Sequence, residues 1–419
     1  MSNPILALIP SGYKGQTTTL PTAPKVFSVL PSDGSGDFDF DRANGLATRI
    51  NKDGLIEEVA DDTPRLDYTN STCPSLLLES ESTNLQFYSQ EFQQQEYDAV
   101  GVTVTANGTT SPSGEVNADK ISRTTTGANY IRSILSKAAV ALEYTSSIFV
   151  KQGEGDYFAF RAQGNYADRI DVTFQFSTKS IVSTNEAGAA ILRGTSVKEL
   201  ANGWFRISFS YLSDTATTLQ NFFAARSTSA NVDSNDPSTT AFIYLWGAMR
   251  EQSTTLSSYI PTLRDESQTR FKDICKEGGD STLFDITEGS FFIDVLPYNS
   301  GLVSTISLSN NSTSQRILIQ FQSNGTQVRL FSSGSVSNYQ TITFNQRNKI
   351  LVTFKLNEYK FYINGALVST DTSATVPTSL DRLNFSNSTA NSDFFQGEVN
   401  DTRVYDTVLT QAEAIKLTT

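Results

Sequence analysis

Short runs in which apolar and polar side chains alternate recur along most of this chain. Residues 170–176 (IDVTFQF) and 204–210 (WFRISFS) are two examples, and turn-forming Ser or Asp residues follow each run. Alternation with a period of two places one set of side chains on a buried face and the other set in solvent, as in a half-buried β-strand. The sequence therefore predicts an all-β fold built from antiparallel jelly-roll sandwiches.

The length of 419 residues exceeds that of one ordinary sandwich and indicates two or three domains. The 27 Phe and 16 Tyr residues suit an aromatic-rich β protein better than a disordered chain. The first 24 residues contain four prolines, which disfavour both a helix and a central β-strand. We therefore expect an extended arm there. The organisation that we expect is an arm at 1–28, a small β collar at 29–86, a first sandwich at 87–263, a linker at 264–279 and a second sandwich at 280–419.

The composition excludes several kinds of chemistry. The chain has no histidine, which removes Ser-His-Asp and Cys-His catalysis and His-ligated zinc. Its net charge is −12 and it has no basic cluster, so nucleic acid is not an expected partner. It has neither a secretory signal nor an apolar run of membrane-spanning length, so we expect no membrane insertion. Cys73 and Cys275 fit no metal or redox spacing and are expected to be two unpaired, buried thiols, with a bridge between them as the alternative.

Local signals in the collar predict short strands. In residues 37–41 (DFDFD) the two phenylalanines face one side and the three aspartates the other. Residues 47–50 and 55–59 flank a loop in which Gly54 can take the positive φ that ends a hairpin turn. Both features predict β structure with one buried face.

The first ninety residues contain a distinctive set of strings, which are 8–14 (LIPSGYK), 28–31 (SVLP), 47–57 (ATRINKDGLIE), 64–68 (PRLDY) and 73–85 (CPSLLLESESTNL). This set resembles the N-terminal module of fibre proteins of tailed bacteriophages, in which such a series precedes jelly-roll domains. The resemblance implies a head or tail fibre that is assembled in the bacterial cytoplasm, lies on the virion surface and has capsid or tail proteins as partners. It implies almost nothing about chemistry.

The second sandwich region contains the hairpin signal Asn364-Gly365, because both central residues of a type I′ turn need positive φ. Near the end of the chain, Thr410 and Glu413 form a capping box that starts the one helix we expect. The strings that carry a resemblance to the concanavalin A-like or laminin-G-like fold are 359–365 (YKFYING), 395–399 (FQGEV), 403–406 (RVYD) and 409–417 (LTQAEAIKL). The first sandwich resembles the carbohydrate-binding-module type of jelly roll at 203–206 (GWFR) and 258–262 (SYIPT).

Sugar binding needs an exposed aromatic ring beside groups that bond hydroxyls. The loop 161–169 (RAQGNYADR) offers such groups, and the carbohydrate-binding residues that we expect are Arg161, Asn165, Tyr166 and Asp168. The alternative is an ordinary solvated hairpin loop. Trp204 and Trp246 lie inside apolar strands and are expected in the core.

Calcium needs several converging oxygen atoms, and concanavalin A-like folds often bind it. The loop residues that could supply these oxygens are Asp233, Asn235 and Asp236, and ordinary turn-forming carboxylates are the alternative. The spacing of 37–41 is similar to that of a calcium loop, but Arg42 stands where glycine is required. Apart from possible calcium, no cofactor is expected.

The sequence thus predicts a non-enzymatic virion protein, anchored by its N-terminal region and displaying sandwiches for weak attachment to host-surface glycans. Docking on the virion and self-association as a trimer or dimer are expected to use apolar residues of the arm and collar, namely Ile5, Leu6, Leu8, Ile9, Phe38 and Phe40. Two alternatives stay open: a tail-associated polysaccharide depolymerase and a ligand-free spacer. The depolymerase needs two carboxylates across a cleft, and the chain has no Glu-x-Asp-x-x-Glu string.

Overall fold

A computed structural model describes residues 4–8, 10, 38–43, 46–69, 72–284, 286–332 and 335–419. The fold of this part is all-β, as predicted, with one short α-helix among its described elements. No helix in these ranges is long and apolar enough to cross a membrane. The chain divides into two compact units, of which unit 1 comprises Met1–Asn44, Val59–Glu81 and Phe271–Thr419, and unit 2 comprises Gly45–Glu58 and Ser82–Arg270.

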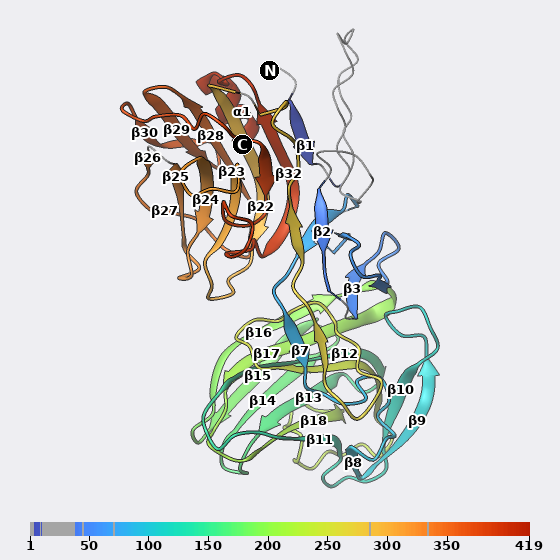
Figure 1. Ribbon diagram of the computed structural model, residues 1–419. Coiled ribbons are helices and arrows are strands. Elements are labelled where there is room, and N and C mark those ends of the chain that lie inside the picture. Colours follow the sequence, from blue (N-terminus) through green and yellow to red (C-terminus); the bar gives the residue numbers. More distant parts are fainter. Residues whose placement is uncertain are drawn as a thin grey trace. The chain divides into compact units, whose positions relative to one another are not determined.

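Unit 2 is a sandwich of two six-stranded antiparallel sheets (Figure 1). The first sheet contains, in spatial order, β16 (Ile191–Glu199), β17 (Trp204–Leu212), β12 (Glu143–Glu154), β19 (Phe242–Glu251), β10 (Ala118–Arg123) and β9 (Val102–Thr109). The second sheet contains β15 (Ser180–Ala187), β14 (Arg169–Gln175), β13 (Tyr157–Gln163), β18 (Thr218–Arg226), β11 (Tyr130–Ser136) and β8 (Tyr97–Val100). A 3-10 turn at Ala201–Gly203 precedes β17, and β7 (Ser82–Asn84) pairs with β20 (Gln268–Arg270).

Aromatic side chains fill the space between the two sheets of unit 2. The ring of Phe160 lies 4.6 Å from that of Phe209 and 4.9 Å from that of Phe223, measured between centroids. All three side chains are buried. The alternation seen in the sequence therefore places one face of each strand in a continuous core.

The predicted hairpin of residues 47–59 packs on unit 2. Its strands are β3 (Ala47–Ile50) and β4 (Ile56–Val59), and Gly54 has the expected positive φ of 78°. Ile56 of this hairpin belongs to a buried cluster with Trp204 and Trp246. Both tryptophans are buried in the core, which confirms that prediction.

Unit 1 is also a sandwich (Figure 1). Its larger sheet contains, in spatial order, β30 (Ala366–Asp371), β29 (Glu358–Ile363), β28 (Asn348–Lys355), β22 (Gly289–Pro297), β32 (Gly397–Tyr405), β6 (Ser75–Leu78) and β5 (Arg65–Asp67), with β1 (Leu6–Leu8) also paired to β32. Its second sheet contains β26 (Ser335–Val336), β25 (Gln327–Ser332), β24 (Arg316–Phe321), β23 (Ser304–Ser309) and β31 (Arg382–Asn384), with β27 (Gln340–Thr341) also paired to β25. A two-stranded ribbon joins β2 (Asp39–Asp41) to β21 (Ile274–Lys276).

Two local predictions for unit 1 are confirmed. Asn364 and Gly365 both have positive φ, 47° and 82°, and connect β29 to β30. The helix α1 (Gln411–Thr418) begins with the predicted capping box, in which Thr410 and Glu413 exchange side-chain to backbone hydrogen bonds. Leu409 and α1 contribute to an apolar cluster with side chains of β22, β28, β29 and β32.

The predicted collar and linker are distributed differently in the structure. The strands β2, β5 and β6 belong to unit 1, whereas β3 and β7 belong to unit 2. The linker region supplies β20 to unit 2 and β21 to unit 1. Such short strands cannot bury a face alone, and β2, β6 and β7 each pair with a strand that is distant in sequence, namely β21, β32 and β20.

The residues expected to dock on other proteins have a different role in the structure. Leu6, Leu8, Phe38 and Phe40 are buried in the core of unit 1, with at most 4% of each residue exposed. Ile5 is half-buried and packs against the same core. Ile9 and most of the predicted arm lie outside the described residues. The apolar pattern of this region thus reflects packing within the chain.

Two charged residues of the fibre-like strings, Arg65 and Glu79, form a buried ion network in unit 1 with Arg42 and Asp273. Arg42 donates to Asp273 Oδ1 from its Nη1 atom at 3.1 Å, and Arg65 pairs with Asp273 and with Glu79 Oε2, the latter at 2.7 Å. The backbone N–H of Glu79 also donates to Asp273 Oδ2 at 2.9 Å. Arg42, Arg65 and Asp273 have fully buried side chains. These ion pairs therefore connect the N-terminal strands of unit 1 to the residue that precedes β21.

The two cysteines differ in their surroundings. Cys275 is buried as expected, whereas Cys73 is exposed, which corrects the prediction for that residue. Burial raises the pKa of the Cys275 thiol, so this group is both inaccessible and protonated at neutral pH.

We expect a thiol reagent such as Ellman's reagent to modify one cysteine of the native chain and two after denaturation. Reaction of both thiols in the native chain would contradict this assignment.

Candidate functional site

A row of residues crosses all six strands of the second sheet of unit 2. The strand registers place six residues directly opposite one another, in the order Asn185, Asp171, Arg161, Phe222, Arg132 and Asp98. Phe160 and Ala162 face the core. Because Arg161 stands between them in β13, its side chain must lie on the opposite face of the strand. We call these six residues the outer row.

Arg161 ties the outer row to the loop that follows β18. Its Nε donates to Asp171 Oδ1 at 2.6 Å, and its Nη1 and Nη2 atoms donate to the two carboxylate oxygens of Asp233, each at 2.9 Å. Arg161 is buried, and burial alone would lower the pKa of its guanidinium group. The hydrogen bonds with Asp233 and Asp171 have a larger effect, so the pKa is raised. Hydrogen bonds from Arg161 likewise hold the pKa of the Asp233 carboxyl below its usual value. This forked ion pair therefore holds the loop that carries Asp233 against β13.

Tyr166 presents an aromatic ring beside this ion pair. The residue is 67% exposed, and its hydroxyl donates to Asp233 Oδ2 at 3.4 Å. The guanidinium of Arg169 lies 5.1 Å from the centroid of the ring, and Arg169 Nη1 donates to the Tyr166 carbonyl at 2.9 Å. The Tyr166 ring is thus held in place by Arg169 and by its hydrogen bond to Asp233, and it is exposed enough to stack on an apolar ligand face.

The other half of the outer row is more open. Phe222 is buried between the guanidinium groups of Arg161 and Arg132, which lie 5.8 and 5.7 Å from its ring centroid. Arg132 donates to Asp98 Oδ2 from Nε and to Gln220 Oε1 from Nη1, each at 3.1 Å, while its side chain stays 28% exposed. A donor and an acceptor for hydroxyl groups are therefore accessible at this end of the row, at Arg132 and Asp98.

The structure separates the four predicted carbohydrate-binding residues into two pairs. Asn165 and Tyr166 have exposed side chains on the loop between β13 and β14. Arg161 is enclosed by its carboxylate partners, and Asp168 accepts a hydrogen bond from the backbone N–H of Ala189 at 2.6 Å. Arg161 is thus closed to a ligand, whereas Asp168 holds the backbone of Ala189 and stays partly exposed.

The three predicted calcium residues also have partners within the protein. Asp233 is occupied by Arg161, and Asp236 accepts hydrogen bonds from Ser227 and from the backbone N–H of Ser238. Asn235 is exposed, and its carbonyl accepts from Arg226 at 3.2 Å. In the described ranges no three His, Cys, Asp or Glu residues group in a way that could hold a metal ion. The loop is therefore held in place by hydrogen bonds from Arg161 and Arg226.

Sequence reasoning missed Arg132, Asp98 and Gln220, which join Arg161 only through the pairing of distant strands. A weak signal did exist in β13, where Arg161 is a charged residue inside a strand whose other face is apolar. The partners of such a residue depend on strand order and register, which one sequence does not reveal.

The sequence and the structure were compared with known proteins. Residues 291–414 match the family model described as the concanavalin A-like lectin/glucanases superfamily. No curated protein matches the sequence. The carbohydrate-binding module CBM40 of a Ruminococcus gnavus sialidase is 16% identical over 34% of this chain and 94% of its own, with a TM-score of 0.29. Domain 4 of an extracellular arabinanase from Geobacillus stearothermophilus is 17% identical over 35% of this chain and 73% of its own, with a TM-score of 0.30. The family match shows a concanavalin A-like jelly-roll domain within unit 1.

Proposed function

We propose that this chain is a non-catalytic, glycan-binding fibre or decoration protein on the virion surface of a tailed phage. The observation that carries the glycan-binding part is the outer row, with the exposed ring of Tyr166 beside it. The resemblance of the first ninety residues to phage fibre modules supports the virion part. Capsid or tail proteins and further copies of the chain, as a trimer or dimer, are the proposed partners.

The chemistry of the outer row, together with that of Asn165 and Tyr166 on the adjoining loop, suits a glycan. Tyr166 can stack on the apolar face of a pyranose, and Asn165 can bond its hydroxyls. Arg132 is paired with Asp98, as Arg161 is with Asp171, so the row has balanced charge. One such open site binds weakly, and repeated copies on one particle would supply avidity.

The arrangement of carboxylates in unit 1 supports a non-catalytic role. Asp294 and Asp401 lie opposite each other on β22 and β32, as two catalytic carboxylates could. However, Asp294 accepts from Arg347 Nε at 2.5 Å, and Asp401 accepts from Arg403 Nε at 3.0 Å. Although burial raises the pKa of Asp401, a carboxylate held by a guanidinium is poorly suited to act as a general acid. A depolymerase is therefore the less favoured reading.

The glycan-binding proposal is tested by screening the full chain on an array of bacterial surface glycans. We expect Tyr166→Ala to weaken binding to every positive glycan roughly tenfold, because the stacking surface is lost. Tyr339→Ala is the matched control, since Tyr339 is a second exposed tyrosine, with the Arg329 guanidinium 5.0 Å from its ring. Equal binding by both variants, or release of reducing ends from the bound glycans, would overturn the proposal.

The virion assignment needs its own measurement. A cryo-EM map of the parent particle should contain density for units 1 and 2 on the outside of the capsid or tail. Density at the tail tip would favour receptor attachment, and density on the head would favour a head fibre. A particle that lacks the chain would contradict the assignment.

A further inference from the structure

One long stretch of unit 1 has no acidic residue. Residues 295–357, which include the strands β23 to β28, contain no Asp or Glu, although the chain has 44 of these residues and a net charge of −12. The neighbouring strands β24 and β25 of the second sheet each carry one arginine, Arg316 and Arg329. A positively charged area on an acidic chain indicates an anionic partner.

Both arginines lie on the face of the second sheet that points away from the core. Ile317 and Ile319 of β24 and Leu330 of β25 belong to the core of unit 1. Because neighbouring residues of a strand point to opposite faces, Arg316 and Arg329 lie on the outer face. Both residues are partly exposed, so an anion in solvent can reach them.

Aromatic rings hold the two guanidinium groups in place. The guanidinium of Arg329 lies 5.0 Å from the ring centroid of Tyr339 and 5.8 Å from that of Phe331. The guanidinium of Arg316 lies 4.4 Å from the centroid of Phe331. Each cation is thus supported by at least one ring. We call Arg316, Phe331, Arg329 and Tyr339 the cationic cluster.

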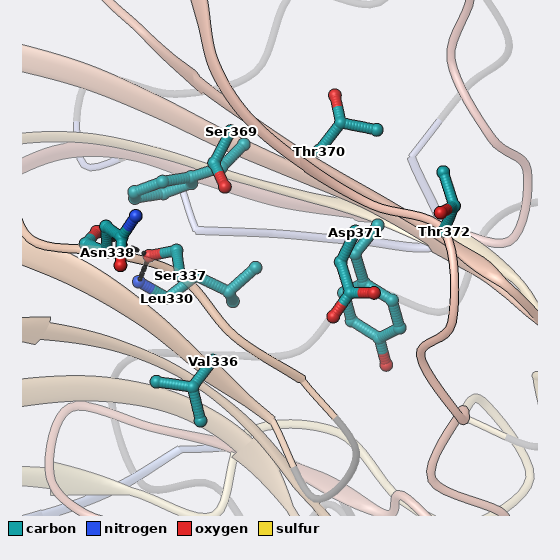
Figure 2. Close-up of a pocket in the computed structure, with 10 residues that line it drawn as sticks. Leu330, Val336, Ser337, Asn338, Ser369, Thr370, Asp371 and Thr372 are labelled. Carbon is teal, nitrogen blue, oxygen red and sulfur yellow. Dashed lines mark hydrogen bonds between the residues drawn. The ribbon is translucent and has the colours of Figure 1, made fainter.

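The segment that carries Tyr339 is tied to β25. Figure 2 shows Ser337 beside Leu330, whose backbone N–H donates to Ser337 Oγ at 2.9 Å. The backbone N–H of Ser337 donates in turn to the Leu330 carbonyl at 3.0 Å. The pocket drawn in Figure 2 has the carboxylate of Asp371 in its lining, which repels an anion. An anion is therefore expected on the outer face of the sheet.

Arg329 presents an open hydrogen-bonding edge. Its Nε donates to Gln320 Oε1 at 2.9 Å, which helps to fix the plane of the guanidinium. Its Nη1 and Nη2 atoms have no hydrogen-bond partner among the described residues. The N–H groups of such an edge match the oxygens of a phosphate or a carboxylate.

Arg316 supplies a second cation on the other side of Phe331. Its Nη1 donates to Ser388 Oγ at 3.2 Å. Burial lowers the pKa of Arg316, so an anion beside its guanidinium would be favourable. In the β24–β25 register, Arg329 opposes Gln320, which is four residues from Arg316 on β24. The backbones of the two arginines are therefore about 13 Å apart along the strands.

We propose that the cationic cluster binds a polymer with repeated phosphodiester groups, as an activity separate from glycan binding at the outer row. The distance between the arginines suits two anionic groups of one extended chain better than a single ion. The uncharged ring of Phe331 lies between them, so the anionic groups of the partner must be separated by an uncharged spacer. A polyol linked by phosphodiesters has such spacers, whereas each residue of polyglutamate carries a charge.

Fluorescence anisotropy of a labelled glycerol-phosphate oligomer tests this site on the full chain. The oligomer contains neither a sugar ring nor a nucleobase. We expect saturable binding at low ionic strength that weakens as salt is added. Arg329→Gln should weaken binding about tenfold, because the charge-assisted hydrogen bonds of the guanidinium are lost. Arg329→Lys keeps the charge without the forked edge and should give an intermediate affinity.

Arg193→Gln is the matched control, because it removes the same charge from an exposed arginine of unit 2. It should leave the affinity for the oligomer unchanged, as should Tyr166→Ala. Three results would each overturn the proposal: the wild-type chain does not bind the oligomer, Arg193→Gln weakens binding as much as Arg329→Gln, or labelled polyglutamate or single-stranded DNA binds more tightly than the oligomer. Glycan binding is measured separately on the array, so failure of this site is distinguishable from failure of the outer row.

Discussion

Replacing Asp273 by alanine is expected to lower the free energy of unfolding of unit 1 by about 3–5 kcal/mol. Arg42 and Arg65 are both buried, and both pair with this carboxylate. The substitution therefore removes an ionic partner from two guanidinium groups that water does not reach. Burial would lower the pKa of Arg65, but Asp273 and Glu79 more than offset this and raise it. The same substitution releases the Glu79 backbone N–H.

Differential scanning calorimetry measures this effect as a shift of the thermal transition that belongs to unit 1. Asp381→Ala is the control, because Asp381 pairs with Arg382 at 2.6 Å on the same unit while both side chains are about one-quarter exposed. An exposed pair of this kind contributes roughly 0–1 kcal/mol. If the two variants lose equal stability, the buried network does not hold the N-terminal strands to β21.

Replacing Arg161 by alanine is expected to destabilise unit 2 by about 3–5 kcal/mol and to abolish glycan binding. The substitution leaves Asp171 with the partly exposed Arg169 and the side-chain amide of Asn185, and it removes the two hydrogen bonds that hold Asp233 to β13. Since the Tyr166 hydroxyl bonds Asp233, the ring then loses part of its support. Tyr166→Ala, in contrast, removes the ring alone and should leave the stability of unit 2 nearly unchanged.

The pair of measurements is calorimetry and glycan binding on the same preparations. Arg193→Ala serves as the control, because Arg193 forms an exposed ion pair with Glu143 in unit 2, and it should affect neither quantity. Loss of stability with retained glycan binding would show that Arg161 is only structural. Unchanged stability would contradict the burial argument itself.

Local features of the fold could be predicted because they depend on neighbouring residues. The turn at Asn364-Gly365 and the capping box at Thr410 are examples, and alternation within β17 places Phe205, Ile207 and Phe209 in the core between the sheets. These predictions needed only backbone preferences and a period of two.

Features that depend on distant pairing could not be predicted. The apolar run containing Leu6 and Leu8 suggested docking on another protein, but its strand pairs with β32, almost 400 residues later in the sequence. Asp273 likewise looked like part of a linker, yet it neutralises Arg42 and Arg65. In both cases the pattern revealed that a residue is buried or charged but not which residue it meets.

The candidate site shows the same division. The loop carrying Tyr166 was identified from its composition, whereas the contribution of Arg132 required the order of β13, β18 and β11. Arg161 and Asp233 were assigned to a sugar site and a metal site, and the structure joins them in one ion pair. Composition indicated the kinds of group present, and only the register indicated their partners.

The central claim, that the outer row binds glycans without cleaving them, is tested most directly by a crystal structure of the chain soaked with an oligosaccharide selected on the array. The account predicts an intact oligosaccharide whose ring stacks on Tyr166 and whose hydroxyls meet Asn165 or Arg132. A glycan bound away from these residues, or a shortened product in the density, would contradict it.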